Sequence, residues 1–161
     1  MLKSPKKSAE QALSLKKVNA VFLEQLRQSK TDIDSDFHGE HKAVFKELDC
    51  LECANCCKTT SPIFLQEDIG RISSYLKIKV GHFILKYLEM DEDGDFVLQK
   101  APCVFLAEDN KCKVYDVRPK ACSEYPHTNR KNMIEILDIT LENTVVCPAV
   151  NEIVKRMRSK L

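Results

Sequence analysis

The feature that most constrains this chain is a run of four cysteines in residues 50–57, spaced C-x2-C-x2-C-C. A two-residue spacer lets a tight turn direct two sulfurs at one metal centre, and a third cysteine at the same spacing adds a third ligand. Single cysteines are often small buried apolar side chains, but that explanation does not account for a clustered run. The sequence therefore predicts metal ligation, and the candidate ligands are all eight cysteines: Cys50, Cys53, Cys56, Cys57, Cys103, Cys112, Cys122 and Cys147.

An even number of cysteines would also suit disulfide bonds in a secreted protein. The N-terminal residues 1–7 are basic, but they are not followed by the apolar run of a secretion signal. No stretch approaches the roughly 20 apolar residues of a membrane span. We therefore expect a cytoplasmic protein with no membrane partner, in a reducing compartment where clustered cysteines bind metal more often than they form disulfides.

Length and charge exclude further classes of protein. The 161 residues are enough for a hydrophobic core, so folding does not depend on covalent crosslinks. Lys and Arg total 25 while Asp and Glu total 24, and this balance argues against a nucleic-acid partner.

The spacing of the cysteines favours an iron–sulfur cluster, of the 4Fe-4S type, and leaves zinc open. Bacterial ferredoxins combine C-x2-C-x2-C with a further cysteine that precedes proline, and Cys147-Pro148 offers such a pair. Structural zinc sites more often use two C-x2-C pairs, whereas eight residues separate Cys103 from Cys112 and nine separate Cys112 from Cys122.

The number of thiols leaves the number of centres open. Eight cysteines are more than one four-ligand centre can use, so the chain holds either two centres or one centre and a reactive thiol pair. Cys56 and Cys57 are adjacent, and we expect their side chains to diverge. One of them would then bind the metal while the other serves a second centre or remains a thiol.

Two further residues are candidates for contacts around the cofactor. Four thiolates on zinc, or on an oxidised four-iron cluster, leave a net charge of about −2, which basic neighbours would offset. Arg118 lies between Cys112 and Cys122, where its planar guanidinium could donate hydrogen bonds to sulfur. His127 follows Cys122 closely enough to approach the site. The candidate cofactor-binding residues are therefore Arg118 and His127.

Apolar periodicity predicts an α+β fold that is mostly helical, with a small β element and cysteine-rich loops packed among the helices. Helices are expected over 8–28, 67–76 and 80–88, and a terminal helix opens at Pro148. We expect two parts. The first, residues 1–39, is an N-terminal helix followed by a polar linker at 30–39. The second, residues 40–161, is a cysteine-cluster metal-binding domain.

The β element is expected between the helices. Strands are predicted over 96–98, 104–106 and 111–115, and a turn joins the last two. The segment 133–139 fits either a strand or a helix. The acidic residues 91–95 lack the glycine position and the final acid of an EF-hand loop, so we interpret them as an acidic turn.

The motifs combine into a recognisable pattern. The cysteine run is followed by Cys103-Val104-Phe105-Leu106, by CKVYDVRPKACSEYP at residues 112–126, and by Cys147-Pro148. This combination covers roughly residues 48–150 and resembles the YkgJ-type cysteine-cluster family, which is described as chelating zinc or iron. The resemblance implies metal chelation rather than a particular reaction. The flagellin lysine N-methylases are a distant branch of that family, which implies a link to protein methylation and a protein substrate or partner.

These observations lead to one preferred function and two alternatives. The preferred function is a metal-binding protein, not a classical enzyme, that chelates an iron–sulfur cluster or zinc through its clustered cysteines. The first alternative is a cluster-dependent protein-lysine methyltransferase-like enzyme. With four glycines and no glycine-rich loop after a strand, it would lack a conventional methyl-donor fold. The second alternative is a thiol redox switch, which needs an exposed thiol of depressed pKa.

Overall fold

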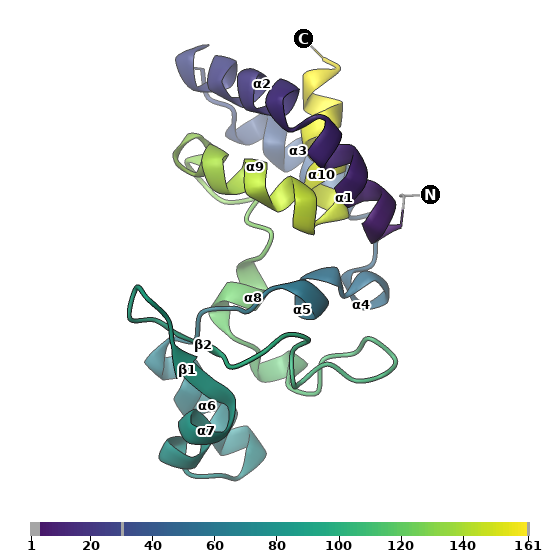
Figure 1. Cartoon of the computed structure of the whole chain (residues 1–161). Helices are drawn as coiled ribbons and strands as arrows, with labels where there is room; N and C mark the ends of the chain where they lie inside the picture. The colour runs from purple at the N-terminus through teal and green to yellow at the C-terminus, as the bar shows by residue number, and fades with distance from the viewer. Residues whose placement is uncertain (1–3, 30, 161) are drawn as a thin grey trace. The chain divides into compact units, whose positions relative to one another are not determined.

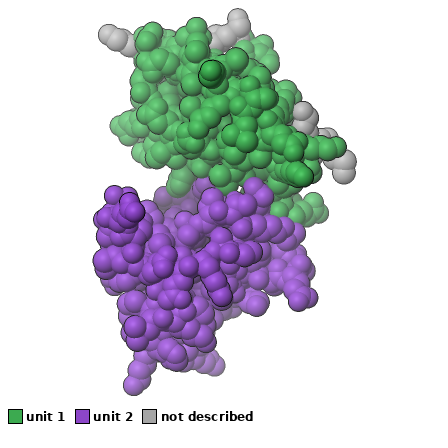
Figure 2. Space-filling view, in the orientation of Figure 1, with its two compact units in different colours: residues 1–53, 126–161 green, residues 54–125 purple. Residues whose placement is uncertain are grey.

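Two segments that are distant in the sequence, residues 1–53 and 126–161, form one unit, and residues 54–125 form a second (Figures 1 and 2). The computed structural model describes residues 4–29 and 31–160. The start of the basic N-terminal segment and the last apolar residue of the predicted terminal helix lie outside the described residues. The described residues are mostly helical with a small antiparallel sheet, so the predicted α+β class is confirmed.

The first unit, called unit 1, is built from helices. Its elements are α1 (Pro5–Ser14), α2 (Lys16–Ser29), α3 (Asp34–Val44), α4 (Cys50–Cys53), the 3-10 helix η2 (Met133–Ile136), α9 (Leu137–Val146) and α10 (Pro148–Arg158). Helix α10 contacts α3, α9 and α1, as Figure 1 shows by the yellow and green helices beside the purple and blue ones. Val150, Ile153 and Val154 on α10 are fully buried, so its apolar stripe forms the centre of this unit.

Helix α10 begins where the sequence predicts it. Pro148 occupies the first helical position, where its missing N–H costs no hydrogen bond. On the same helix, the Asn151 side chain donates to the backbone oxygen of Ser8 at 3.1 Å and to its hydroxyl at 3.0 Å. These buried hydrogen bonds hold α1 on α10, because an unsatisfied amide in this position would carry a desolvation cost.

The predicted polar linker at 30–39 is wrong over its second half, where α3 begins at Asp34. The Asp34 carboxylate accepts backbone N–H groups from Asn132 at 2.7 Å and Met133 at 2.8 Å. Phe37 on this helix is fully buried. A polar segment with few apolar residues is therefore helical because tertiary contacts, which local composition does not show, stabilise it.

Two other helical expectations need adjustment in unit 1. The helix expected over 8–28 is divided into α1 and α2 by a turn at Leu15. The segment 133–139 is helical, as η2 and the start of α9. His38 and His41 on α3 bind the loop before η2, with contacts of 2.7 Å to the Arg130 backbone oxygen and 2.8 Å to the Thr128 hydroxyl.

The second unit, called unit 2, contains the sheet. Its elements are α5 (Asn55–Thr59), α6 (Gln66–Leu76), α7 (Val80–Tyr87), β1 (Leu88–Met90), β2 (Phe96–Leu98), the 3-10 helix η1 (Tyr115–Val117) and α8 (Lys120–Glu124). Strands β1 and β2 pair antiparallel, with Leu88 opposite Leu98. The predicted strand at 96–98 and the helices near 67–76 and 80–88 are confirmed.

The acidic residues 91–95 form the turn between β1 and β2. The Asp91 carboxylate accepts the backbone N–H groups of Asp93 at 3.0 Å and Asp95 at 2.9 Å. Gly94 has φ +84°, a conformation that glycine adopts without steric cost. The Asp91 carboxylate therefore organises the turn by accepting hydrogen bonds from the backbone of the loop.

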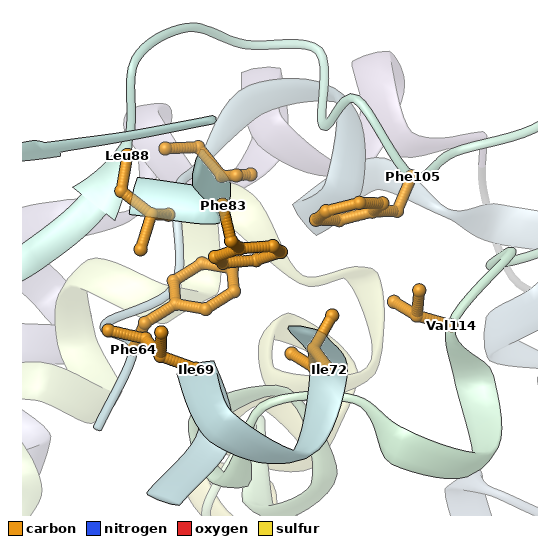
Figure 3. Packing of buried hydrophobic residues seen from close by; sticks show 8 residues of the cluster. Phe64, Ile69, Ile72, Phe83, Leu88, Phe105 and Val114 are labelled. Atoms are coloured by element: carbon orange, nitrogen blue, oxygen red, sulfur yellow. The ribbon is translucent and has the colours of Figure 1, made fainter. Parts of the chain in front are cut away.

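An apolar cluster at the centre of unit 2 supports the cysteine loops (Figure 3). The Phe83 ring stacks on Phe105 with 6.1 Å between centroids, and it lies at the same distance from Phe64. Cys103 and Cys112 pack against this cluster from its edge. The buried members of the cluster are Phe64, Ile69, Ile72, Phe83, Leu88, Leu98, Phe105 and Val114.

Candidate metal centre

None of the eight cysteines, all of which the structure describes, takes part in a disulfide bond. Cys57, Cys103, Cys112 and Cys122 lie in unit 2 and act on one another electrostatically. Cys50, Cys53 and Cys147 form a corresponding group within unit 1. We call these the unit 2 thiols and the unit 1 thiols.

The unit 2 thiols come from separate segments that backbone hydrogen bonds join. Cys57 lies on α5, and its carbonyl accepts the N–H of Cys103 at 2.8 Å. Cys103 precedes a tight loop that returns to Cys112, where Leu106 and Cys112 form an isolated bridge. Cys122 lies on α8. Backbone contacts thus join the segments of Cys57, Cys103 and Cys112, and charge at these three residues acts on Cys122.

The strands predicted at 104–106 and 111–115 do not form, so this prediction is wrong. The two segments nevertheless pair through an isolated bridge. Only the single bridge at Leu106 and Cys112 forms between them, with the Lys113 N–H donating to the Phe105 carbonyl at 2.8 Å. Tyr115 then opens the 3-10 helix η1.

Backbone N–H groups point at two of the unit 2 sulfurs. The Cys103 sulfur accepts from the N–H groups of Phe105 and Leu106, and the Cys112 sulfur accepts from that of Val114. A hydrogen bond to the charged form favours the thiolate, and it also holds the sulfur in one orientation. These N–H groups therefore oppose part of the effect of burial on the two thiols.

Cys57 has the most acidic thiol of this group. A hydrogen bond from the Cys56 side chain lowers the pKa of Cys57 to about 7, and the charge of Lys58 adds to the effect. The expectation that the Cys56 and Cys57 side chains diverge is therefore wrong. The Cys56 thiol turns toward its neighbour within this short helix and donates to its sulfur.

Burial has the opposite effect on the other unit 2 thiols. It raises the pKa of Cys122 to about 12, with further contributions from negative charge at Cys57, Cys103 and Cys112. Burial also raises the pKa of Cys103 and that of Cys112. Without a cation these three thiols stay protonated at neutral pH, because burial disfavours the charged form and neighbouring thiolates repel one another. A bound metal supplies the charge that would ionise them.

The two candidate residues beyond the cysteines lie in different units. The Arg118 guanidinium lies 4.0 Å from the Tyr115 ring centroid and donates to the Tyr115 carbonyl at 2.8 Å. Its positive charge lowers the pKa of Cys112 and of Cys122 against the larger effect of burial. His127 belongs to unit 1, where its backbone has φ +66° and its carbonyl accepts the Arg130 N–H at 3.4 Å.

The unit 1 thiols lie at the start of two helices. Cys50 and Cys53 are the first and last residues of α4, and Cys147 caps the N-terminus of α10. The backbone N–H groups of Val150 and Ala149 lower the pKa of Cys147, although its side chain makes no capping hydrogen bond to the first turn of α10. Burial, with negative charge at Cys50 and Cys53, nevertheless raises the pKa of Cys147 to about 11.

Sequence analysis did not identify Asp68 and Arg71 as residues that position a thiol. The buried Asp68 carboxylate accepts N–H groups from Leu65 at 3.0 Å and Lys120 at 3.1 Å, and the Arg71 guanidinium at 2.6 Å. Arg71 also donates to the Arg118 carbonyl at 2.9 Å. Lys120 lies 52 residues from Asp68 along the chain, so no local pattern indicates this contact.

The donors suit a thiophilic metal, although they do not form a closed cage. Within residues 4–29 and 31–160, no three His, Cys, Asp or Glu side chains converge closely enough to hold an ion as they stand. The unit 2 thiols influence one another's pKa, and backbone contacts join the segments of Cys57, Cys103 and Cys112. Thiolate sulfur is the ligand that zinc and iron–sulfur clusters prefer, so the residues present fit either group.

Part of the chain is similar to a known protein. An uncharacterized protein of Methanocaldococcus jannaschii, MJ0661, is 30% identical over 82 residues, which are 49% of this chain and 44% of that relative. The match therefore spans less than half of the relative's length. No solved structure matches the chain. In the part of the chain that the structure describes, no helix combines the length and the apolar character needed to cross a membrane.

The family assignment rests on the cysteine pattern. Residues 49–148 match the model of the family described as "CxxCxxCC: Putative zinc- or iron-chelating domain". This range contains all eight cysteines and most of the chain. The chain therefore belongs to the CxxCxxCC family of zinc- or iron-chelating domains.

Proposed function

We propose that this protein binds a 4Fe-4S cluster through the unit 2 thiols, with Cys57, Cys103, Cys112 and Cys122 as ligands. The observation that carries the proposal is the pairing of their segments, because the Cys103 N–H donates to the Cys57 carbonyl at 2.8 Å and Leu106 forms a bridge with Cys112. The effect of charge at Cys57, Cys103 and Cys112 on the pKa of Cys122 supports the same grouping. Four cysteines are also the usual ligand number of such a cluster.

Each of these ligands comes from its own segment, so the site lacks the short two-cysteine knuckle that structural zinc sites usually contain. The loops after Cys103 and Cys112 supply N–H groups to sulfur, and such bonds tune the potential of iron–sulfur centres. A bound cluster would supply one-electron redox chemistry and a crosslink between the loops.

The residues of the chain prepare the ligands for this role. Cys57 is the thiol that ionises first, because its pKa is about 7. Phe105, Leu106 and Val114 hold two further sulfurs in place through their backbone N–H groups. The remaining protons leave when the metal binds, so metal binding is coupled to both proton release and folding.

Anaerobic purification tests the proposal directly. A brown protein that contains iron and acid-labile sulfide supports a cluster, and a colourless protein with stoichiometric zinc contradicts it. Cys122→Ser should abolish iron and sulfide in unit 2. Ser123→Ala is the matched control, because its exposed hydroxyl lies on the same helix and donates only to the Lys120 carbonyl among the bonds described. If Cys122→Ser retains full iron and sulfide, Cys122 is not a ligand.

A second candidate function is thiol redox chemistry at the Cys56–Cys57 pair. It is favoured by the depressed pKa of Cys57, since the thiolate is the reactive form of cysteine. Counting reactive thiols in the fully loaded protein discriminates between the two functions. Protection of Cys57 by bound metal supports ligation, whereas rapid alkylation of Cys57 in the loaded protein supports the redox role.

A further inference from the structure

We propose that Arg71 is a positioning residue of the unit 2 centre, which holds the segment 117–120 on α6 and so fixes Cys122 before a metal binds. This inference rests on the proposed function, in which Cys122 is a ligand, and it gives a role to a residue that binds no metal itself. Residues 117–120 join the end of η1 to the start of α8, the helix that carries Cys122. Backbone contacts join the other three ligand segments, whereas side chains of α6 hold this one.

The segment needs outside partners because a proline interrupts its backbone hydrogen bonding. Pro119 has no N–H, and the residue before a proline is disfavoured in a helix. Arg118 and Pro119 are accordingly extended, with ψ angles of 154° and 147°. Helix α8 then begins after a proline, whose side chain has no oxygen to accept the N–H groups of the first turn. The polar backbone groups at this junction therefore pair with side chains from elsewhere.

Arg71 and Asp68 supply these partners from one turn of α6. The Arg71 Nε donates to the Val117 carbonyl at 3.3 Å, and its Nη2 donates to the Arg118 carbonyl at 2.9 Å. The Asp68 carboxylate accepts the Lys120 N–H at 3.1 Å, so it caps α8 from another element. Among the described residues, these three are the segment's only hydrogen bonds to a distant part of the chain.

The two side chains act as one unit. The Arg71 Nη2 also donates to the Asp68 carboxylate at 2.6 Å, since the two residues lie one helical turn apart. A guanidinium donates in several fixed directions within one plane, whereas an ammonium is a single point charge. Arg71 can therefore pair with the buried Asp68 and hold two carbonyls at once. A lysine at this position would keep the ion pair but not the whole set of hydrogen bonds.

The first turn of α8 passes this constraint to the ligand. The Cys122 N–H donates to the Pro119 carbonyl at 2.9 Å, so the held segment determines where Cys122 lies. None of these bonds involves a metal, so they place the thiol in advance. A ligand that is already held loses less conformational freedom when the metal binds, and the affinity of the centre is correspondingly higher.

Amide hydrogen exchange of the metal-free full-length chain tests whether Arg71 holds the segment. In Arg71→Met the N–H groups of Lys120 and Cys122 should exchange at least about tenfold faster than in the parent, because the segment loses its bonds to α6. Arg71→Lys should fall between the two, since it keeps the charge without the planar fork. If Arg71→Met does not fold, the comparison is made with Arg71→Lys. Exchange at the parent's rate would overturn the proposal.

Removal of iron by a chelator tests the effect on the ligand. Each variant is loaded anaerobically with ferrous iron and sulfide, and the rate of cluster loss is compared with that of the parent. Arg71→Met should lose iron about tenfold faster, as is typical when a residue that orients a ligand is removed.

Ile69→Val is the matched control for a general loss of stability. Ile69 is fully buried on the same helix and lies beside Phe64 in the apolar cluster (Figure 3). Its truncation lowers stability but removes no bond to the segment, so iron loss should stay within about twofold of the parent's rate. Equal acceleration in Arg71→Met and Ile69→Val would contradict positioning, because lower stability would then be the cause.

The outcomes separate this inference from the proposed function. If the parent takes up no iron and sulfide, the proposed cluster fails and Arg71 positions no ligand, even where exchange shows that it holds the segment. If the parent is loaded and Arg71→Met loses iron at the parent's rate, the cluster stands and the role of Arg71 fails. Faster exchange and faster iron loss in Arg71→Met, with neither in Ile69→Val, supports both.

Discussion

The Asp68 carboxylate on α6 accepts the backbone N–H of Lys120 at 3.1 Å, and Lys120 is the first residue of the helix that carries Cys122. The Asp68 side chain is 2% exposed, and both of its oxygens accept hydrogen bonds. A buried acid thus connects the apolar core of unit 2 to one of its proposed ligands. This relationship makes the position of Cys122 depend on a residue that binds no metal.

Asp68→Asn should destabilise unit 2 by about 1–3 kcal/mol, because one carboxylate oxygen becomes an amide that faces a donor. Chemical denaturation of the metal-free protein measures this change. Asp138→Asn is the matched control, since Asp138 pairs with Arg27 but its side chain is 85% exposed. We expect a cost below about 1 kcal/mol there. An equal loss in both variants would show that burial of Asp68 is not the cause.

The metal-free protein should lose stability as pH rises above 9.0, the ordinary pKa of its thiols. In the folded state the pKa is about 11 for Cys147 and about 12 for Cys122, so both keep their protons while the unfolded thiols lose theirs. The folded state then binds more protons than the unfolded state, and the free energy of unfolding falls with rising pH.

Denaturation of the parent chain and of Cys122→Ser across this alkaline range measures the effect. Lysines and tyrosines titrate in both proteins, so the difference between the two isolates the thiol. The parent should lose stability more steeply by up to about 1.4 kcal/mol per pH unit. Parallel curves would contradict the raised pKa of Cys122.

Cys56→Ala should raise the pKa of Cys57 from about 7 toward its ordinary value of 9.0, because the hydrogen bond from Cys56 is the largest of the effects that lower this pKa. Alkylation of Cys57 in the metal-free protein at pH 7 should slow by more than about tenfold, since the thiolate is the reactive species. Mass spectrometry of the modified peptide assigns the rate to Cys57. Lys58→Met, which removes the smaller influence, should slow alkylation less, and the reverse order would contradict the Cys56 hydrogen bond.

Phe83→Ala should destabilise the protein by about 3–5 kcal/mol, because it removes a fully buried ring from the apolar cluster. It should also lower metal content, since Phe83 stacks on Phe105 and Cys103 packs against the same cluster. Thermal unfolding and metal analysis measure the two effects. Tyr75→Ala on α6 is the control, as Tyr75 is 51% exposed. Full metal content in a destabilised Phe83→Ala protein would show that the cluster does not position the thiols.

Much of the fold and of the chemistry could be predicted from local sequence. The helices α6, α7 and α10 follow from apolar periodicity and from Pro148, because these signals act within a few residues. The family and its metal chemistry follow from the C-x2-C-x2-C-C run, since ligand spacing is also a local property.

The tertiary structure alone decided which thiols are neighbours. The run of four cysteines divides between the units, with Cys50 and Cys53 in unit 1 and Cys56 and Cys57 in unit 2, and Cys147 from the far end of the chain belongs to unit 1. Helix α3 likewise forms in a polar segment because Asp34 and Phe37 meet partners that no local pattern indicates. The physical reason is the same in each case. Spacing determines what a sulfur or a carboxylate can bind, whereas the path of the chain determines what it meets.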